Sequence, residues 1–409
     1  MKYVIIGNSA AGIGAVEGIR HVDGQGEITI ISNEEHHTYS RPLISYLLLG
    51  KVAEEGMKYR DSEFYIENNC KLLAGIAVTA IKPIEKKVIL ADARAIPYDR
   101  LLVATGSSAF VPSFKGLDTV GKKYTFMNLD DARLLDLNLD KGKRVLIIGA
   151  GLIGLKCAEG IANRVSDITV LDLAPRVLSS ILDDGGAKLI QNRLESAGIR
   201  LILSCGINSF EKDTAILDSG EKISFDVLVL AVGVRPNTSL LNGIAKIDKG
   251  IIINAKSETT APDIYAAGDC TQTMDVSSGQ SKIMALLPNA YMQGECAGIN
   301  MARGRKAFDK AMPMNAIGFF GLHVLTAGNY IGEVYSENED GNYKRLFYSN
   351  NRLNGYILIG NVERAGIYTS LIRERTPLNT IDFALICEKP GLMAFAKEER
   401  QIKLGWDTK

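Results

Sequence analysis

The chain has 409 residues, 46% hydrophobic and 23% charged, which is the composition of a folded globular protein and excludes a disordered or fibrous one. A chain of this length is expected to form two or three domains with separate cores. Basic and acidic residues are equal in number at 47 each, so the formal net charge of zero gives no electrostatic reason to expect nucleic acid or an anionic membrane as a partner.

The beginning of the chain lacks the features of a targeting segment. The apolar run at residues 3–6 is too short for a signal peptide and is followed by Gly7, Asn8 and Ser9 instead of a cleavage site. No stretch reaches the roughly 18 uninterrupted apolar residues that a membrane span requires. The sequence therefore predicts a cytoplasmic protein without a membrane partner.

The first thirty residues follow the order strand, glycine turn, helix and strand, which is typical of a dinucleotide-binding unit. We predict strands at 3–6 and 27–31 and a helix at 13–22, with the turn GNSAAG at 7–12. Small side chains let the helix N-terminus approach a pyrophosphate, whose charge the exposed N–H groups and the helix dipole stabilise. Ser9 replaces the middle glycine, so this motif alone is a weak signal.

The same order recurs near residue 145. A strand at 144–148 leads into GAGLIG at 149–154, a helix at 155–162 and a strand at 168–171 that ends on Asp172. Asp172 follows Gly149 at about the 20 residues expected for the acid that binds a ribose 2′-hydroxyl. Because a carboxylate there would repel a 2′-phosphate, NADH is favoured over NADPH, although Arg176 nearby keeps NADPH open as an alternative. Two such units in one chain predict two dinucleotides that form a redox pair.

Three further segments complete a family pattern. They are LLVATG at 101–106, AVGVRP at 231–236 and IYAAGD at 264–269. With the two glycine motifs they make the chain resemble the pyridine nucleotide-disulfide oxidoreductase superfamily of flavoproteins, especially its NADH:rubredoxin oxidoreductase and NADH oxidase branch. The resemblance covers nearly the whole chain.

The resemblance implies an α/β fold with two Rossmann-like dinucleotide-binding domains and a small α+β C-terminal interface domain. The FAD domain would comprise residues 1–112 and 245–311, the NAD(P) domain 113–244, and the interface domain 312–409. Strands at 345–348 and 353–360 and a helix at 365–373 are predicted in the last of these.

The resemblance also implies which residues contact each cofactor. For FAD they are Gly7, Ser9, Ala10, Ala11, Gly12, Glu34, Arg41, Pro42, Val78, Thr105, Gly106, Gly268, Asp269, Asn289 and Ala290. For NAD they are Gly149, Gly151, Leu152, Ile153, Gly154, Asp172 and Gly233.

For four of these FAD assignments we expect a specific role, and each has an alternative. Glu34 would replace Ser32 as the acid on the adenosine ribose, or else be a solvated carboxylate. Arg41 would bind a phosphate, or else be an exposed arginine. Asp269 would lie against the ribityl and pyrophosphate region, or else cap a helix. The helix that starts near Asn289 would point its N-terminus at the flavin pyrimidine, or else be a plain buried helix.

The chain departs from its relatives in its cysteines. The six cysteines have neither C-x-x-C nor metal-site spacing, and there is none between residues 36 and 55, where relatives keep a reactive one. We therefore expect no disulfide reduction and no cysteine sulfenate, with electrons leaving directly from FAD. The cysteines are predicted to be small core residues, and one functional thiol stays open as an alternative.

A second departure concerns a Lys/Glu pair that many relatives place beside the flavin and the nicotinamide. The lysine position looks to be Tyr46 here and the glutamate position Lys156. We hypothesise that Lys156 supplies a positive charge near the flavin; an ordinary helix lysine whose stem packs on apolar surface is the alternative.

These observations predict an FAD-dependent NAD(H) oxidoreductase that passes electrons between NADH and a one-electron iron-sulfur carrier such as rubredoxin or ferredoxin, as a monomer or homodimer. One alternative is an NADH oxidase that reduces dioxygen to peroxide. Another is a slow-turnover flavin-bound subunit of a redox complex. A basic cluster could steer an acidic carrier, or be a solvated turn. Its members are Arg303, Arg305, Lys306 and Lys310.

Overall fold

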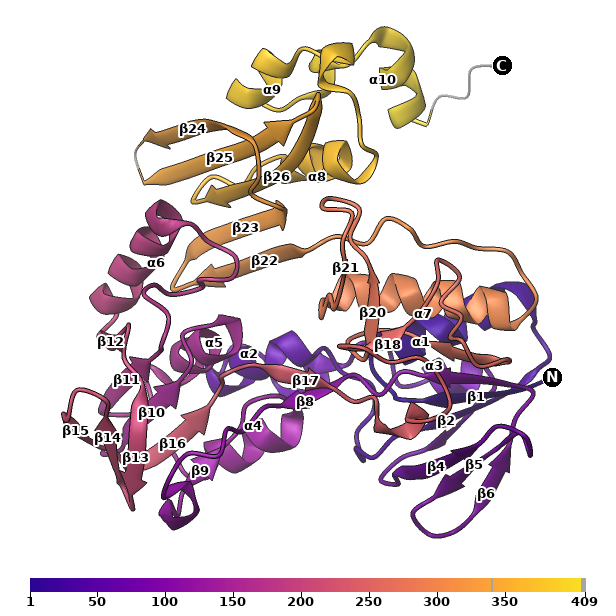
Figure 1. The fold of residues 1–409 in the computed structure, drawn as a ribbon, viewed down its shortest axis with the longest axis horizontal. Coiled ribbons are helices and arrows are strands. Elements are labelled where there is room, and N and C mark those ends of the chain that lie inside the picture. Colours follow the sequence, from indigo (N-terminus) through magenta and orange to yellow (C-terminus); the bar gives the residue numbers. More distant parts are fainter. Residues whose placement is uncertain (340, 406–409) are drawn as a thin grey trace. The chain divides into compact units, whose positions relative to one another are not determined.

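A computed structural model describes residues 1–339 and 341–405 (Figure 1). The chain divides into two compact units. The first comprises residues 1–180, 191–273 and 282–308, and the second comprises 181–190, 274–281 and the described residues from 309 onward.

A five-stranded parallel sheet forms around the first glycine motif. Its strand order is β19-β7-β1-β2-β3. The strands are β1 (Lys2–Ile6), β2 (Glu27–Ile31), β3 (Cys70–Leu73), β7 (Arg100–Val103) and β19 (Ile264–Ala266). The apolar run predicted at 3–6 is thus the central strand, buried from Tyr3 to Ile6, as expected for a parallel sheet that is covered on both faces.

Two helices pack closely against each other beside this sheet, α1 (Ala10–Val22) and α7 (Leu287–Met301). Glycines on both helices make this approach possible. A Cβ on Gly294 would lie 2.0 Å from the Ala11 carbonyl oxygen, and one on Gly298 would lie 2.2 Å from that of Ala15. Backbone of one helix therefore occupies the space in which the other would carry side chains.

A second five-stranded parallel sheet surrounds the second glycine motif, with the order β12-β11-β10-β16-β9. Its strands are β9 (Lys123–Tyr124), β10 (Arg144–Ile148), β11 (Asp167–Leu171), β12 (Ile199–Ile202) and β16 (Val227–Leu230). The helices along this part of the chain are α4 (Leu129–Asp136), α5 (Leu152–Ile161) and α6 (Asp184–Ser196). A two-stranded ribbon of β8 (Ser107–Ala109) and β17 (Val234–Pro236) links the segments that follow β7 and β16.

The remaining elements of the first part of the chain are short. Three small sheets contain β4 (Val78–Lys82), β5 (Lys87–Leu90) and β6 (Ala95–Pro97); β13 (Ile207–Glu211), β14 (Thr214–Leu217) and β15 (Lys222–Ser224); and β18 (Ile251–Ile252), β20 (Thr271–Met274) and β21 (Ser281–Lys282). The short helices are α2 (Ile44–Leu48) and α3 (Phe64–Glu67), with 3-10 turns at Arg41–Leu43, Glu54–Met57, Leu117–Thr119 and Ser239–Leu241.

The second unit is built on a five-stranded antiparallel sheet with the order β22-β23-β26-β25-β24. Its strands are β22 (Met314–Phe319), β23 (Leu322–Gly328), β24 (Glu333–Glu339), β25 (Asn342–Ser349) and β26 (Arg352–Ile359). Its helices are α8 (Ala365–Arg373), α9 (Phe383–Glu388) and α10 (Lys397–Lys403), with 3-10 turns at Leu378–Thr380 and Leu392–Ala394. Helix α8 packs on β26, and Tyr356 and Tyr368 are buried where they meet.

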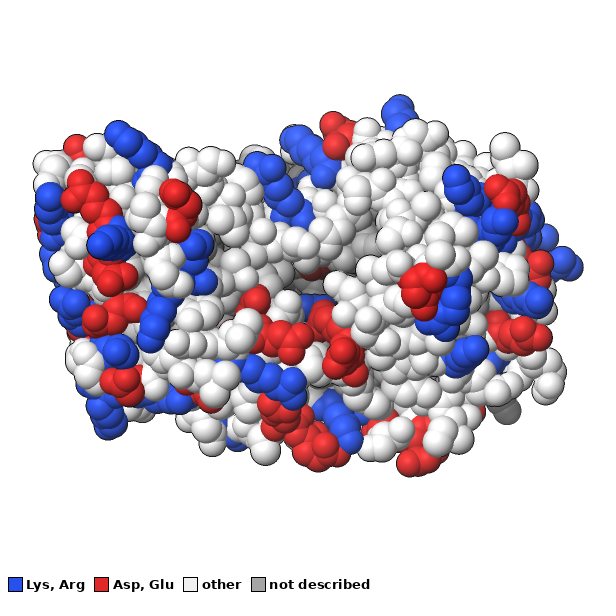
Figure 2. Space-filling model, turned by 90° about the horizontal axis from the view of Figure 1, so that it is seen from below, with Lys and Arg blue, Asp and Glu red and all other residues white. Residues whose placement is uncertain are grey.

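The surface carries charges of both signs. Lysine and arginine side chains alternate with aspartate and glutamate side chains over the face drawn in Figure 2. Many are paired, for example Arg144 with Asp226 at 3.0 Å. Within the described ranges, each helix is too short or too polar to cross a bilayer.

Substitution of Gly294 tests the packing of α1 on α7. Gly294→Ala is expected to lower the free energy of unfolding by about 1–3 kcal/mol, because the new methyl group must displace backbone of α1. Gly24→Ala, in open space just after α1, is the matched control and should change stability by less than about 0.5 kcal/mol. Equal urea midpoints for both variants would contradict the packing described here.

Candidate functional site

The first glycine motif forms a turn at the N-terminus of α1. Gly7 has φ 122°, and a Cβ there would lie 2.1 Å from the Ala104 carbonyl oxygen. A Cβ on Gly12 would lie 2.1 Å from the carbonyl oxygen of Gly7. Ser9 precedes the helix without capping it by its side chain, and the first turn carries no acidic residue. The helix N-terminus therefore suits an anionic group such as a pyrophosphate.

Three predicted FAD contacts from distant parts of the chain meet beside this turn. Gly268 has φ 83°, and a Cβ there would lie 3.2 Å from the Ala11 side chain and 3.5 Å from that of Ala290. The buried amide of Gln293 on α7 fixes the segment, because its oxygen accepts hydrogen bonds from the Gly268 N–H at 2.8 Å and from the Thr271 hydroxyl at 3.1 Å. Asn289, also predicted, is buried in the first turn of α7.

Asp269 lies next to these residues. Burial raises the pKa of its carboxyl group, while Arg41 and a 3.4 Å hydrogen bond from Ser107 act in the opposite direction. The alternative interpretation of Asp269 as a helix N-cap is wrong, because the element that follows is β20.

The crossover between the two parallel sheets is held by hydrogen bonds to Asn237. The predicted residue Thr105 donates its hydroxyl to the Asn237 carbonyl at 2.6 Å, and the Asn237 side chain donates to the Thr105 carbonyl at 2.9 Å. Gly106, with φ 64°, accepts from the Asn237 N–H at 2.9 Å. Sequence patterns gave no indication of Asn237.

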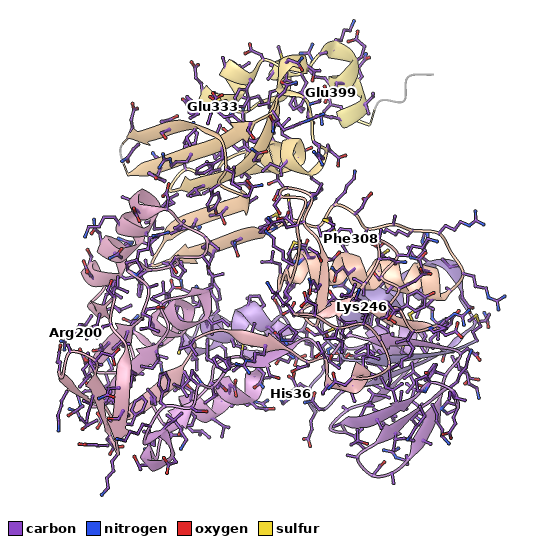
Figure 3. The ribbon with its side chains drawn as sticks, viewed as in Figure 1. His36, Arg200, Lys246, Phe308, Glu333 and Glu399 are labelled. Carbon is purple, nitrogen blue, oxygen red and sulfur yellow. The ribbon has the colours of Figure 1, made fainter. Side chains whose placement is uncertain are left out.

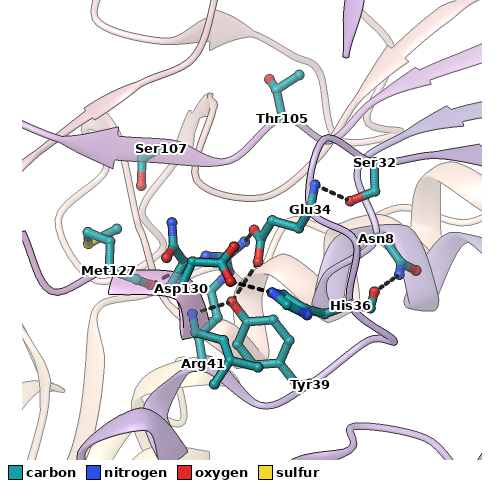
Figure 4. Close-up of polar contacts among 12 residues, drawn as sticks. Asn8, Ser32, Glu34, His36, Tyr39, Arg41, Thr105, Ser107, Met127 and Asp130 are labelled. Atoms are coloured by element: carbon teal, nitrogen blue, oxygen red, sulfur yellow. Dashed lines mark hydrogen bonds and ion pairs between the residues drawn. The ribbon is translucent and has the colours of Figure 1, made fainter. Parts of the chain in front are cut away.

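Glu34 and Arg41 form an ion pair on the loop that follows β2 (Figure 4). Tyr39 donates a hydrogen bond to the other oxygen of Glu34 at 2.7 Å. The Glu34 side chain is only 17% exposed, so the alternative interpretation as a solvated carboxylate is wrong. Pro42 follows in the 3-10 turn after this loop.

Burial and charge fix the protonation states in this loop. Burial raises the pKa of the Tyr39 phenol, which therefore stays protonated and can donate. Burial lowers the pKa of the Arg41 guanidinium, but Tyr39 and Glu34 outweigh that effect and the pKa is raised overall. Arg41 is thus a permanent cation held in place beside Asp269.

The same loop is tied to the start of α4. Arg41 donates to the Met127 carbonyl at 3.3 Å, and Tyr39 accepts from the Leu129 N–H at 3.0 Å. His36, labelled in Figure 3, contacts the Asp130 carboxylate at 2.7 Å. The loop therefore connects the first parallel sheet to the start of α4, which lies between β9 and β10 of the second sheet.

Two buried polar atoms near the first glycine motif lack a hydrogen-bond partner among the described residues. They are Nε2 of His37 and the hydroxyl of Thr38. Tyr65 connects this place to the glycine turn, because its hydroxyl accepts from the Thr38 N–H at 3.1 Å and donates to Asn8 at 2.8 Å. Unsatisfied buried polar atoms beside a turn shaped for an anion fit a site that is completed by a polar ligand. Val78, in contrast, starts β4 and packs in an apolar cluster.

The second glycine motif repeats the geometry of the first. Gly149 has φ 113°, and a Cβ there would lie 2.3 Å from the Ala231 carbonyl oxygen. A Cβ on Gly154 would lie 2.0 Å from the Gly149 carbonyl oxygen. Gly151 faces open space and precedes α5, whose first turn holds the predicted residues Leu152 and Ile153. Gly233, after β16, has φ 122° and also faces open space.

Asp172 lies at the end of β11, next to this turn. Its two carboxylate oxygens accept hydrogen bonds from the Ala150 N–H at 2.6 Å and the Ala174 N–H at 2.8 Å. These bonds orient the carboxylate at the edge of the glycine turn, where the sequence predicts the ribose.

Lys156 is enclosed between two helices. Its ammonium group lies 4.6 Å from the centre of the Tyr46 ring and forms an ion pair with Glu159 one turn along α5. The Lys156 side chain is 14% exposed. Helices α2 and α5 approach closely there, because Gly160 lies against the Ser45 carbonyl. The two positions at which the sequence departs from its relatives therefore contact each other.

The cysteines are core residues for the most part. Four are buried and two, Cys70 and Cys205, are half-buried, with no disulfide among the described residues. Burial raises the pKa of Cys70, Cys270 and Cys387 to about 11 each. Thiols of this kind are protonated at neutral pH and are poor nucleophiles.

Residues 1–294 match the family described as pyridine nucleotide-disulphide oxidoreductase. The chain belongs to this family. Residues 313–376 match the domain described as the rubredoxin NAD+ reductase C-terminal domain. The family identifies the chain as an FAD-dependent NAD(H) oxidoreductase, and both glycine turns fit these two cofactors.

Known proteins of this family resemble the chain over most of its length. It is 30% identical over 394 residues to the NADH-dependent phenylglyoxylate dehydrogenase subunit epsilon of Aromatoleum evansii, covering 93% of each chain. It is also 30% identical over 394 residues to the nitrite reductase [NAD(P)H] of Bacillus subtilis, covering 92% of this chain but only 48% of that longer protein. The crystal structure of a covalent putidaredoxin reductase-putidaredoxin complex has a chain with the same fold, with a TM-score of 0.87, 23% identity and coverage of 100% of this chain and 99% of that one.

Replacement of Arg41 tests the loop that follows β2. Arg41→Met is expected to weaken FAD binding roughly 10-fold or more, because a charged hydrogen-bond donor is lost and Glu34 is left without its cation. Fluorescence titration of the apoprotein with FAD measures this. Arg133→Met is the control. It removes an exposed arginine of α4 that pairs with Glu54, and this variant should bind FAD normally. Equal FAD affinities for the two variants would remove Arg41 from the site.

Replacement of Asp172 tests nicotinamide dinucleotide selectivity. Asp172→Asn is expected to weaken NADH binding roughly 10-fold and to narrow the preference for NADH over NADPH, since the charge that repels a 2′-phosphate is gone. Asp167→Asn, at the opposite end of β11, should leave both affinities unchanged. An unaltered NADH:NADPH ratio in Asp172→Asn would show that another group selects the dinucleotide.

Proposed function

We propose that this protein transfers electrons between NADH and a one-electron iron-sulfur carrier protein of the rubredoxin or ferredoxin type. The observation that carries the proposal is the combination of two dinucleotide turns with the absence of cysteine from residues 36–55, followed by a domain of the rubredoxin reductase type. The two turns would bind the two cofactors of the redox pair. Without a cysteine at residues 36–55, no thiol there can accept the two electrons between FAD and the acceptor.

FAD, when bound, accepts a hydride from the nicotinamide and can release the two electrons singly. The chain's own residues orient the reactants for this. The turn at Gly7–Gly12 and the turn at Gly149–Gly154 would each hold a pyrophosphate at a helix N-terminus. Glu34 and Arg41 would bind the adenosine side of FAD, and Asp172 would select NADH.

Lys156 would add a fixed positive charge beside the reacting rings. Tyr46 and Glu159 hold its ammonium group in place. The ammonium group would therefore need little reorganisation when negative charge gathers on the reduced flavin. Glu159 offsets part of this charge. Lys156 is thus proposed as an electrostatic and positioning residue, with no proton transfer.

We propose that the two parallel sheets mark an FAD domain of residues 1–112 and 245–311 and an NAD domain of residues 113–244, with residues 312–409 as the interface domain. We further propose that the protein works in the cytoplasm, where NADH is the available reductant.

A second candidate function is that of a flavin-bound subunit in a larger redox complex. The relative from Aromatoleum evansii is named as a subunit of an NADH-dependent dehydrogenase, and the chain spans about half of the Bacillus subtilis nitrite reductase. Tight co-purification with a partner, together with negligible turnover of the isolated chain, would favour this second candidate.

The acceptor is identified by anaerobic stopped-flow absorbance. NADH should bleach the flavin band rapidly and NADPH more slowly, and oxidised rubredoxin or ferredoxin should then restore the band much faster than air does. Restoration by air at the rate of the best carrier would instead assign the protein as an NADH oxidase. Slow restoration by all of these acceptors would favour the subunit function.

Removal of the Lys156 charge tests its proposed role. Lys156→Met is expected to lower the flavin midpoint potential by roughly 10–40 mV, which corresponds to about 0.5–2 kcal/mol for a two-electron couple and is the size of one charge at about 10 Å in a partly screened site. Lys141→Met, an exposed lysine, is the control. Equal potentials in the two variants would reduce Lys156 to a packing residue.

A further inference from the structure

The second unit contains a cavity of about 310 Å³ whose lining residues all belong to that unit. Its volume is at the lower end of the roughly 300–1,000 Å³ of small-molecule sites. The lining comes from the loop between β20 and β21, the β25–β26 hairpin, the end of β23 and the end of α8 (Figure 1). None of these residues takes part in the two dinucleotide turns.

The hairpin that forms one wall has a defined local structure. Asn350 and Asn351 have φ 51° and 59°, and their neighbours Ser349 and Arg352 are paired across the hairpin. Asparagine favours this two-residue turn, because it tolerates positive φ better than most side chains. The tight turn fixes Arg352 at the start of β26, where its half-buried side chain lines the cavity.

The opposite wall is a loop organised around a buried carboxylate. Asp275 is 0% exposed and accepts hydrogen bonds from the hydroxyl groups of Ser277 and Ser278, each at 2.7 Å. Asn329 donates its side-chain amide to the Ser277 carbonyl at 2.5 Å, which attaches the loop to the end of β23. A loop of small polar residues is thus held in one conformation, and its buried carboxylate is not among the residues that line the cavity.

The charged residues that line the cavity are both cationic. Among its lining residues only Arg352 and Arg375 are charged, and neither has a carboxylate partner in the described part of the chain. Two lysines of the same unit do have carboxylate partners, Lys310 with Glu374 and Lys344 with Glu337. Two guanidinium groups beside hydroxyl and amide groups are suited to bind an oxyanion through bidentate hydrogen bonds.

We propose that this cavity binds a small phosphorylated metabolite through Arg352 and Arg375. The cavity is a site separate from those for FAD and NAD, and the proposal does not depend on the identity of the electron acceptor. A polycarboxylate presents the same oxyanion chemistry, so the test includes both kinds of anion.

Isothermal titration of the FAD-loaded protein with pyrophosphate and with citrate tests the proposal. Saturating NAD+ is present throughout, so that the pyrophosphate position of the second glycine turn is occupied. One site per chain is expected, with pyrophosphate tighter than citrate. Tighter binding of citrate, or an absence of saturable binding, would overturn the assignment to a phosphorylated ligand.

Three variants and a control connect any binding to this cavity. Arg352→Gln and Arg375→Gln should each weaken pyrophosphate binding roughly 10-fold or more. Asn350→Asp keeps both arginines and the turn conformation but adds a negative charge to the wall, so it should also weaken binding. Arg305→Gln, at an exposed arginine of the first unit, should bind as the parent does. Equal affinities for all four variants would place the anion elsewhere and overturn the proposal.

Discussion

The close approach of two backbone segments at each glycine turn is the constraint on which both dinucleotide sites depend. After β1 the chain passes within contact of Ala104, which follows β7, and after β10 it passes equally close to Ala231, which follows β16. A side chain at Gly7 would push α1 away from its sheet, and one at Gly149 would do the same to α5. The helix N-terminus could then no longer meet a pyrophosphate at the carboxyl ends of the strands, where α/β folds bind their ligands.

Small residues also permit close packing in the surroundings of the first glycine turn. The α1–α7 contact, made by glycines on both helices, brings Ala11 and Ala290 next to Gly268. The residues predicted to hold FAD therefore meet because three backbone segments share one narrow space. Arg41 adds positive charge to this site, because it pairs with Glu34 and lowers the pKa of Asp269 against the effect of burial.

The sequence predicted the local part of this arrangement well. Strand β2 matches its prediction, and the predicted helix at 365–373 coincides with α8. Helices α1 and α5 begin three residues earlier than predicted, because the small residues taken as turn are already helical after Ser9 and Gly151. Periodicity marks where apolar faces lie, but it does not show at which residue a glycine turn becomes a helix.

Contacts between distant segments could not be predicted from the sequence. Tyr39, Gln293 and Asn237 fix the predicted site residues through hydrogen bonds, and no sequence pattern indicated these bonds. The basic cluster proposed from the sequence is partly neutralised, since Lys306 and Lys310 each pair with a glutamate. Tyr46 and Lys156 were recognised as the two changed positions of a Lys/Glu pair, and the fold shows that the lysine now lies over the tyrosine ring.

The most direct test is an anaerobic titration of the flavin band with NADH, because the central claim is that flavin is the protein's only redox centre. One equivalent of NADH per FAD should complete the bleaching. A requirement for two equivalents would reveal a redox-active disulfide and contradict the account.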